Sequence, residues 1–191
     1  CVMFATGRVP HIAGLGLEAA GVLLENGAVK VDDDNQTNIP SIYAVGDVTN
    51  RVQLTPVAIR EGQAFADTVF GGKPTRVDYG CIPSAVFSHP PIGAVGLTES
   101  QAKQKYGSVR VYTSDFRPMK NVLAGRNERA LYKMVCDAAS NRVVGMHMIG
   151  PESGEIIQVA AVAIKAGLSK QAFDDTVALH PSMAEELVLM K

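Results

Sequence analysis

The spacing of hydrophobic positions along the chain changes near residue 80. Before that point, short apolar runs alternate with turns, and one longer segment carries apolar side chains at intervals of three or four residues. This spacing predicts a helix from about Pro56 to Phe70, with Pro56 in the first position and Thr55 as its cap. Gly71–Pro74 closes this helix and predicts a domain boundary.

Three further elements are expected in the first eighty residues. The pair Asn26-Gly27 lies between two apolar runs, Val22–Glu25 and Ala28–Val31, and predicts a β-hairpin because both residues readily adopt positive φ. A short buried strand is expected at Ser41–Val45, and a short helical stretch around Leu17 to Ala20.

The pattern of the second part predicts one antiparallel sheet with helices. Alternating apolar and polar positions predict five strands, at Pro83–Ser88, Gly93–Gly96, Val109–Phe116, Ala130–Asp137 and Val143–Ile149. Helices are expected after the capping box Thr98–Gln101, from about Glu152 to Ala166, and after Pro181 with its end at Leu189, and Ser169 is expected to cap a short turn. The expected fold class is an α/β segment followed by an α+β domain, whose antiparallel sheet has helices on one face.

Composition excludes several classes of function. The chain has 191 residues, of which 18 are basic and 19 acidic, so its net charge of −1 gives no electrostatic footprint for nucleic acid or an anionic membrane. No apolar run approaches the ~20 residues of a membrane span. Cys1, Cys81 and Cys136 are odd in number and far apart, which favours a reducing, cytoplasmic location over a disulfide framework.

A metal site is not expected. An EF-hand loop starting at Asp32 needs Gly at its sixth place and Glu at its twelfth, but those places hold Thr37 and Tyr43. No pair of Cys or His residues has the spacing of zinc ligands. We therefore interpret the aspartate-rich run as a solvated turn.

Four motifs occur in order along the chain: Ala5–Pro10, Ile42–Val48, Leu54–Ile59 and His180–Glu186. Each is weak alone, but four in this order are specific. Together they resemble the C-terminal half of the pyridine nucleotide–disulfide oxidoreductases, and the resemblance covers the whole chain.

The resemblance implies a division into three parts: residues 1–9 end an NADPH-binding domain, residues 10–80 complete an FAD-binding domain, and residues 81–191 form a dimerisation domain. It also implies that the G-x-G-x-x-G turn and the redox-active C-x-x-x-x-C pair, both missing from these residues, lie upstream. Cys1–Gly7 fits a buried strand, and because a domain seldom opens in mid-strand we expect a fragment.

Cofactor contacts are expected from two neighbouring motifs. Asp47 follows Gly46 at the end of the expected strand, where a carboxylate can accept hydrogen bonds from sugar-alcohol hydroxyls. The resemblance assigns it to the ribityl chain of FAD; the alternative is a simple turn cap. It also implies cofactor contacts from Gln53, Leu54 and Thr55, because unpaired N–H groups and the helix dipole at a helix start favour an anionic reduced flavin.

Gly7 is a further cofactor candidate. The resemblance implies that its backbone contacts the nicotinamide nucleotide, while the alternative interpretation is a tight turn.

His180 and Glu185 are the candidate catalytic residues. A thiolate leaves more easily when it is protonated, and histidine, with an unperturbed pKa of ~6.5, suits a general acid. A carboxylate on the other ring nitrogen would fix the tautomer and stabilise the imidazolium. The competing interpretation is that Ser182 and Glu185 form a capping box and do nothing else. In the family this His reaches the site of the partner subunit, so a homodimer is implied.

The function implied by the resemblance is NADPH-dependent, FAD-containing reduction of glutathione disulfide. Ser182 stands where Thr is usual, and Gln63 stands where some glutathione-specific members carry Arg, so trypanothione and lipoamide types stay open as alternatives. A different alternative is a non-catalytic dimerisation fragment.

Overall fold

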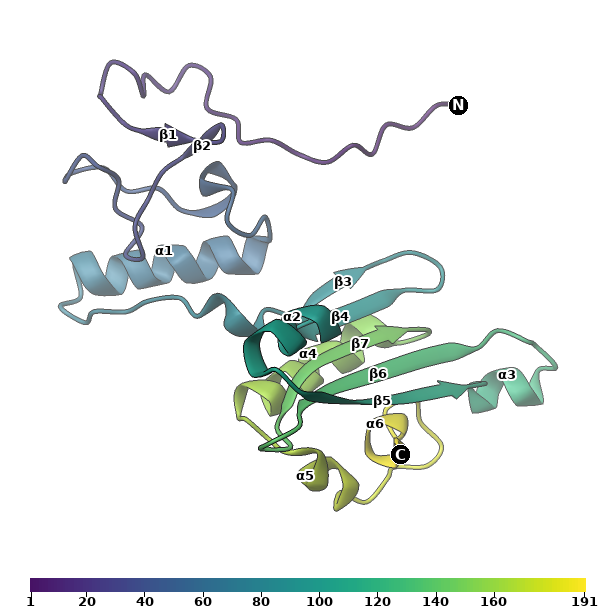
Figure 1. Ribbon diagram of the computed structural model, residues 1–191. Helices are drawn as coiled ribbons and strands as arrows, with labels where there is room; N and C mark the ends of the chain where they lie inside the picture. Colours follow the sequence, from purple (N-terminus) through teal and green to yellow (C-terminus); the bar gives the residue numbers. More distant parts are fainter. The chain divides into compact units, whose positions relative to one another are not determined.

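The protein is described by a computed structural model covering residues 1–191 (Figure 1). Two compact units divide the chain, the first formed by Cys1–Asp78 and the second by Tyr79–Lys191.

The first unit has little regular structure apart from one helix. Its elements are β1 (Leu24–Glu25), β2 (Ala28–Val29), the 3₁₀ helix η1 (Gly46–Thr49) and α1 (Thr55–Val69). Strands β1 and β2 pair antiparallel across Asn26 and Gly27, whose φ angles of 51° and 77° are the positive pair that a tight hairpin turn needs. The predicted hairpin is therefore present, with shorter strands.

Three segments of this unit lack the secondary structure that the sequence predicted. Tyr43 forms an isolated bridge with Gln36, and Ser41–Val45 contains no strand. Leu17–Ala20 is a turn, and Cys1–Gly7 is exposed and without regular structure. A strand needs a neighbour for its N–H and C=O groups, and within this unit only β1 and β2 form a ladder.

Helix α1 confirms the predicted segment but corrects its cap. Leu54 occupies the N-cap position without a side-chain hydrogen bond, so Thr55 is the first helical residue and Pro56 follows it. Proline is tolerated there because its missing N–H would have no helical partner. The buried face of α1 contains Val57, Glu61 and Ala64.

The second unit is built around one antiparallel sheet, as predicted. Its strand order is β3-β4-β7-β6-β5 (Figure 1). The strands are β3 (Ser84–Val86), β4 (Ile92–Gly96), β5 (Val109–Phe116), β6 (Ala130–Asp137) and β7 (Val143–Ile149), preceded by the 3₁₀ helix η2 (Tyr79–Cys81).

One face of this sheet and helix α4 (Ser153–Lys165) form the main core. Alternate residues of β6 and β7, including Tyr132, Met134 and Met146, are fully buried there against Ile157. Gly93 permits the close approach of α4, since a Cβ at this position would lie 2.7 Å from the carbonyl oxygen of Ser153.

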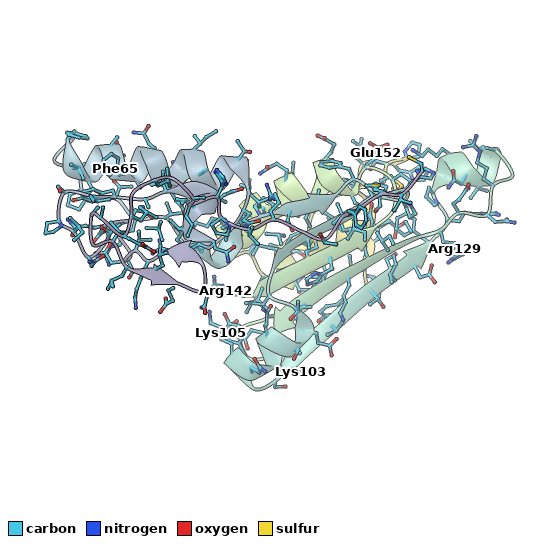
Figure 2. All side chains as sticks on the ribbon, turned by 90° about the horizontal axis from the view of Figure 1, so that it is seen from above. Phe65, Lys103, Lys105, Arg129, Arg142 and Glu152 are labelled. Carbon is cyan, nitrogen blue, oxygen red and sulfur yellow. The ribbon has the colours of Figure 1, made fainter.

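Helices lie on both faces of the sheet, whereas one face was expected. Helix α2 (Glu99–Tyr106) packs against β5, β6 and β7, and Lys133 of β6 donates a hydrogen bond to Glu99 at 2.7 Å. Because side chains alternate along β6, Lys133 and the buried Val135 face away from the α4 core. Figure 2 shows Lys103 of α2 and Glu152, which precedes α4, on opposite sides of the sheet.

The remaining helices are short. Thr98 forms a capping box with Gln101 at α2, as predicted. Ser169 is a cap, also as predicted, but it begins the helix α5 (Lys170–Asp174) where only a short turn was expected. The sequence did not indicate α3 (Met119–Leu123), and α6 is limited to Glu186–Leu189. Buried Lys170 ties the end of the chain to α5, since its Nζ donates to the carbonyl oxygen of Met190 at 2.8 Å.

Candidate functional site

His180 and Glu185 form an ion-pair contact just before α6. Nδ1 of His180 lies 2.9 Å from Oε2 of Glu185. A carboxylate can only accept, so Nδ1 carries the proton in this contact. The His180 side chain is 64% exposed and that of Glu185 is 11% exposed. The ring is therefore held at Nδ1, while most of the side chain is exposed.

Glu185 also closes the turn that carries the histidine. Its Oε1 accepts the Ser182 N–H at 3.3 Å, while its own N–H donates to Ser182 Oγ at 3.2 Å. This reciprocal pattern is a capping box. The two interpretations of Glu185 are therefore compatible, because one carboxylate oxygen serves the cap and the other serves the ring.

A cavity of about 380 Å³ lies beside this pair, between the end of β5, α3 and the start of α6. Its lining mixes apolar and charged side chains: Phe116, Arg117, Pro118, Met119, Lys120, Leu123, Glu152, Pro181, Ser182, Met183, Glu185 and Glu186. The mixture suits a ligand that carries charges of both signs.

In the first unit, Gly46 places the candidate Asp47. Gly46 has φ +74°, and a Cβ there would lie 3.0 Å from Cβ of Ala58, so only glycine fits without strain. Its N–H donates to Oε2 of Glu61 at 2.6 Å, and its carbonyl oxygen accepts from Thr49 Oγ1 at 2.9 Å. Glu61 is 1% exposed. A buried carboxylate thus fixes the backbone directly before Asp47.

Arg8 brings two predicted segments together. Its Nη1 lies 3.3 Å from Oδ2 of Asp47, and its Nη2 donates to the carbonyl oxygen of Gln53 at 2.7 Å. Gln53 in turn donates from Nε2 to Asn50 Oδ1 at 2.9 Å. Asp47 is half exposed, so its carboxylate is open to further hydrogen bonds.

Helix α1 begins two residues after Gln53, with Leu54 as its N-cap. Leu54 accepts the N–H groups of Val57 and Ala58, while Thr55 contributes a first-turn N–H and Pro56 has none. Gly7 has φ +96° and no atom within 4 Å of a built Cβ. It precedes Arg8 in the chain and makes no backbone hydrogen bond to the other candidates.

This donor set fits the flavin cofactor that the resemblance implies. The Asp47 carboxylate is an acceptor for hydroxyl groups, and the start of α1 offers an N–H and the positive end of a 15-residue helix. Asp47 and the segment Gln53–Thr55 could hold such a cofactor.

Two residues of these sites were missed in the sequence. Glu61 sits on an amphipathic helix, where a glutamate normally faces solvent, so nothing in the pattern marks it as buried. Arg8 belongs to the Ala5–Pro10 motif, but its contact with Asp47 joins positions 39 residues apart. Neither contact has a local sequence signal.

No group of three or more metal-ligating side chains occurs in the structure, and no helix is both long and apolar enough to cross a bilayer. All three cysteines are free. Burial raises the pKa of Cys136 to about 11, so this thiol stays protonated and acts as a core residue.

The fold matches a solved disulfide reductase. The structure titled HOCl-induced flavoprotein disulfide reductase RclA from Escherichia coli superposes with a TM-score of 0.85 at 29% identity, covering 96% of this chain and 42% of that one. The fold is therefore that of a flavoprotein disulfide reductase.

The sequence itself shows the family. Residues 1–62 match the pyridine nucleotide-disulphide oxidoreductase family, and residues 82–191 match its dimerisation domain. The chain belongs to the pyridine nucleotide-disulphide oxidoreductases, which confirms the resemblance and the predicted fold class, apart from the helix α2 on the second face of the sheet.

Curated relatives include glutathione reductases from Pisum sativum and Burkholderia cepacia, each 54% identical over the full chain, and trypanothione reductase from Trypanosoma congolense at 44%. The chain spans 35% to 42% of the length of these relatives. The pea relative is named as chloroplastic/mitochondrial, so a cytoplasmic location for the present protein stays a prediction.

Proposed function

We propose that this chain is the C-terminal part of an NADPH-dependent, FAD-containing reductase that converts glutathione disulfide to glutathione. In this proposal His180 is the general acid, Glu185 holds its ring, and the enzyme works as a homodimer. Residues 1–9 end the NADPH domain, residues 10–80 complete the FAD domain, and residues 81–191 form the dimer interface.

The contact between His180 and Glu185 carries this proposal. An exposed imidazole whose Nδ1 is bonded to a carboxylate presents Nε2 outward in a defined orientation. The negative charge of Glu185 stabilises the ring when it is protonated at both nitrogens. His180 then donates its Nε2 proton to the sulfur that leaves when the substrate disulfide is broken.

The overall reaction balances with one cofactor molecule per substrate. NADPH gives up a hydride, the disulfide accepts its two electrons, and one further proton from solvent completes the second thiol. When bound, FAD would supply a two-electron redox centre between NADPH and a disulfide. The residues proposed to hold FAD are Gly46, Asp47, Gln53, Leu54 and Thr55, with Gly7 beside the nicotinamide nucleotide.

Two observations support the homodimer. His180 is on the surface of its own unit, and residues 82–191 match a dimerisation domain. A proton donor in this position can act on a disulfide that another protomer carries. The match to a dimerisation domain supports association of two protomers. That His180 of one protomer acts in the site of the other is part of the proposal.

The test separates the two half-reactions in the full-length, FAD-loaded enzyme. His180→Gln should leave reduction of the flavin by NADPH unchanged, whereas turnover with glutathione disulfide should fall by about 100-fold or more. Turnover within a few-fold of the parent would contradict the acid role. Parallel assays with trypanothione disulfide and lipoamide identify the substrate, and a preference for either would overturn the glutathione assignment.

A further inference from the structure

The cavity next to His180 and Glu185 contains five charged side chains, and four of them have partners within the chain. Glu152 pairs with Lys120 at 3.4 Å, and Glu186 accepts the hydroxyl of Ser114 at 2.6 Å. The fifth charge, Arg117, forms no hydrogen bond or ion pair within the chain.

The backbone next to Arg117 is held in place by burial and hydrogen bonds. The next residue, Pro118, is fully buried, and its carbonyl oxygen accepts the N–H of Asn121 at 2.8 Å. Asn121 is itself 6% exposed, and its Nδ2 donates to the carbonyl oxygen of Glu128 at 3.1 Å. The exposed guanidinium of Arg117 is therefore attached to an ordered turn at the wall of the cavity.

We propose that Arg117 determines substrate specificity by binding a carboxylate of the disulfide substrate in this cavity. A guanidinium presents two parallel N–H groups that match the two oxygens of a carboxylate. Glu186, which uses only Oε2 for the Ser114 hydroxyl, lines the same cavity and complements the ammonium group of a zwitterionic peptide end. The ligand class is thus a peptide disulfide with free carboxylates, placed so that its sulfur atoms can approach His180.

This inference rests on the proposed function, and it adds a residue that selects the substrate without taking part in proton transfer. Arg117→Gln in the full-length, FAD-loaded enzyme should raise KM for glutathione disulfide about tenfold with little change in kcat, because a charge-assisted contact is lost in binding. Arg117→Lys should restore part of the affinity. Flavin reduction by NADPH should not change.

The esterified substrate isolates the carboxylate. When the carboxylates of glutathione disulfide are converted to methyl esters, the KM of the parent enzyme should rise by the same factor. The KM of Arg117→Gln should be no higher for the ester than for glutathione disulfide. Arg129→Gln is the matched control, since Arg129 pairs with Asp115 at 2.7 Å and does not line the cavity.

The outcomes distinguish failure of the proposed function from failure of the role of Arg117. A parent enzyme that does not reduce glutathione disulfide overturns the proposed function and the role of Arg117 with it. If the parent is active, two results would overturn the role of Arg117 alone. One is a KM that Arg117→Gln leaves unchanged, and the other is a variant whose KM rises for the ester as much as that of the parent.

Discussion

The Glu185 carboxylate links the His180 ring to the turn that begins α6. Its Oε2 contacts Nδ1 of His180 at 2.9 Å, and its Oε1 accepts the N–H of Ser182 at 3.3 Å. One side chain therefore orients the proposed acid and fixes the backbone beside it. Substitutions can separate these two roles.

Glu185→Gln should separate charge from capping. The amide oxygen can still accept a hydrogen bond, but the charge that stabilises the imidazolium is gone. We expect disulfide reduction to fall tenfold or more, with unfolding free energy changed by less than about 1 kcal/mol. Stopped-flow kinetics and urea titration measure the two quantities. Wild-type turnover in this variant would show that the carboxylate serves only the cap.

Ser182→Ala is the complementary change. It removes the hydroxyl that accepts the Glu185 N–H, and loss of such a cap costs about 1 kcal/mol. Ser182→Thr keeps the hydroxyl and serves as the control, with stability close to that of the parent. Equal stability of the alanine and threonine variants in urea would show that the cap contributes nothing.

Tyr132→Phe should not destabilise the second unit. The Tyr132 side chain is fully buried, its hydroxyl has no hydrogen-bond partner, and burial raises its pKa. Phenylalanine keeps the edge contact with the Phe116 ring, whose centroid is 5.1 Å away, and removes an unsatisfied polar group. We expect stability to be unchanged or higher by about 1 kcal/mol. A loss above about 2 kcal/mol in urea titration would mean that the hydroxyl has a stabilising partner.

Glu61→Ala should weaken binding of the flavin, although Glu61 itself is not proposed to contact the flavin. The substitution removes the carboxylate that accepts the Gly46 N–H and leaves a cavity in a buried site, at a cost of about 2–4 kcal/mol. We expect FAD affinity, measured by flavin fluorescence on titration of the full-length apoprotein, to fall at least tenfold. Glu61→Gln keeps an acceptor oxygen and should lose less. Unchanged FAD affinity in the alanine variant would exclude a positioning role for Glu61.

Glu99 should make the stability of the second unit depend on acidic pH. Hydrogen bonds from Lys103 and Lys133 lower its pKa from 4.5 to about 2. A lowered carboxyl pKa means that the contribution to stability is complete above about pH 4.5 and is lost as the pH falls toward 2. Glu99→Gln should flatten the stability curve within this window only. Parallel curves for parent and variant between pH 4.5 and 2 would contradict the assignment.

The sequence predicted best where the structure depends on local pattern. The boundaries of β5, β6 and β7 match to the residue, because each extends over seven or eight positions and pairs with a neighbouring strand along most of its length. The caps at Thr98 and Ser169 were also found, since capping is decided within three residues.

Prediction failed where structure depends on distant partners. Ser41–Val45 has the composition of a buried strand, but within its own unit it finds only the bridge to Gln36. The face on which α2 packs depends on sheet order, which no local pattern encodes. Of the candidate sites, the pair His180 and Glu185 was found through its motif, whereas burial of Glu61 required the fold.

The most direct test of the central claim uses hybrid dimers of the full-length enzyme. One protomer carries His180→Gln, and its partner carries a serine in place of a redox-active cysteine. If the acid acts across the interface, one of the two sites keeps an intact histidine and an intact disulfide, and the hybrid retains about half of the parental activity. If His180 acts within its own protomer, both sites are damaged and the purified hybrid is inactive, which would contradict the account.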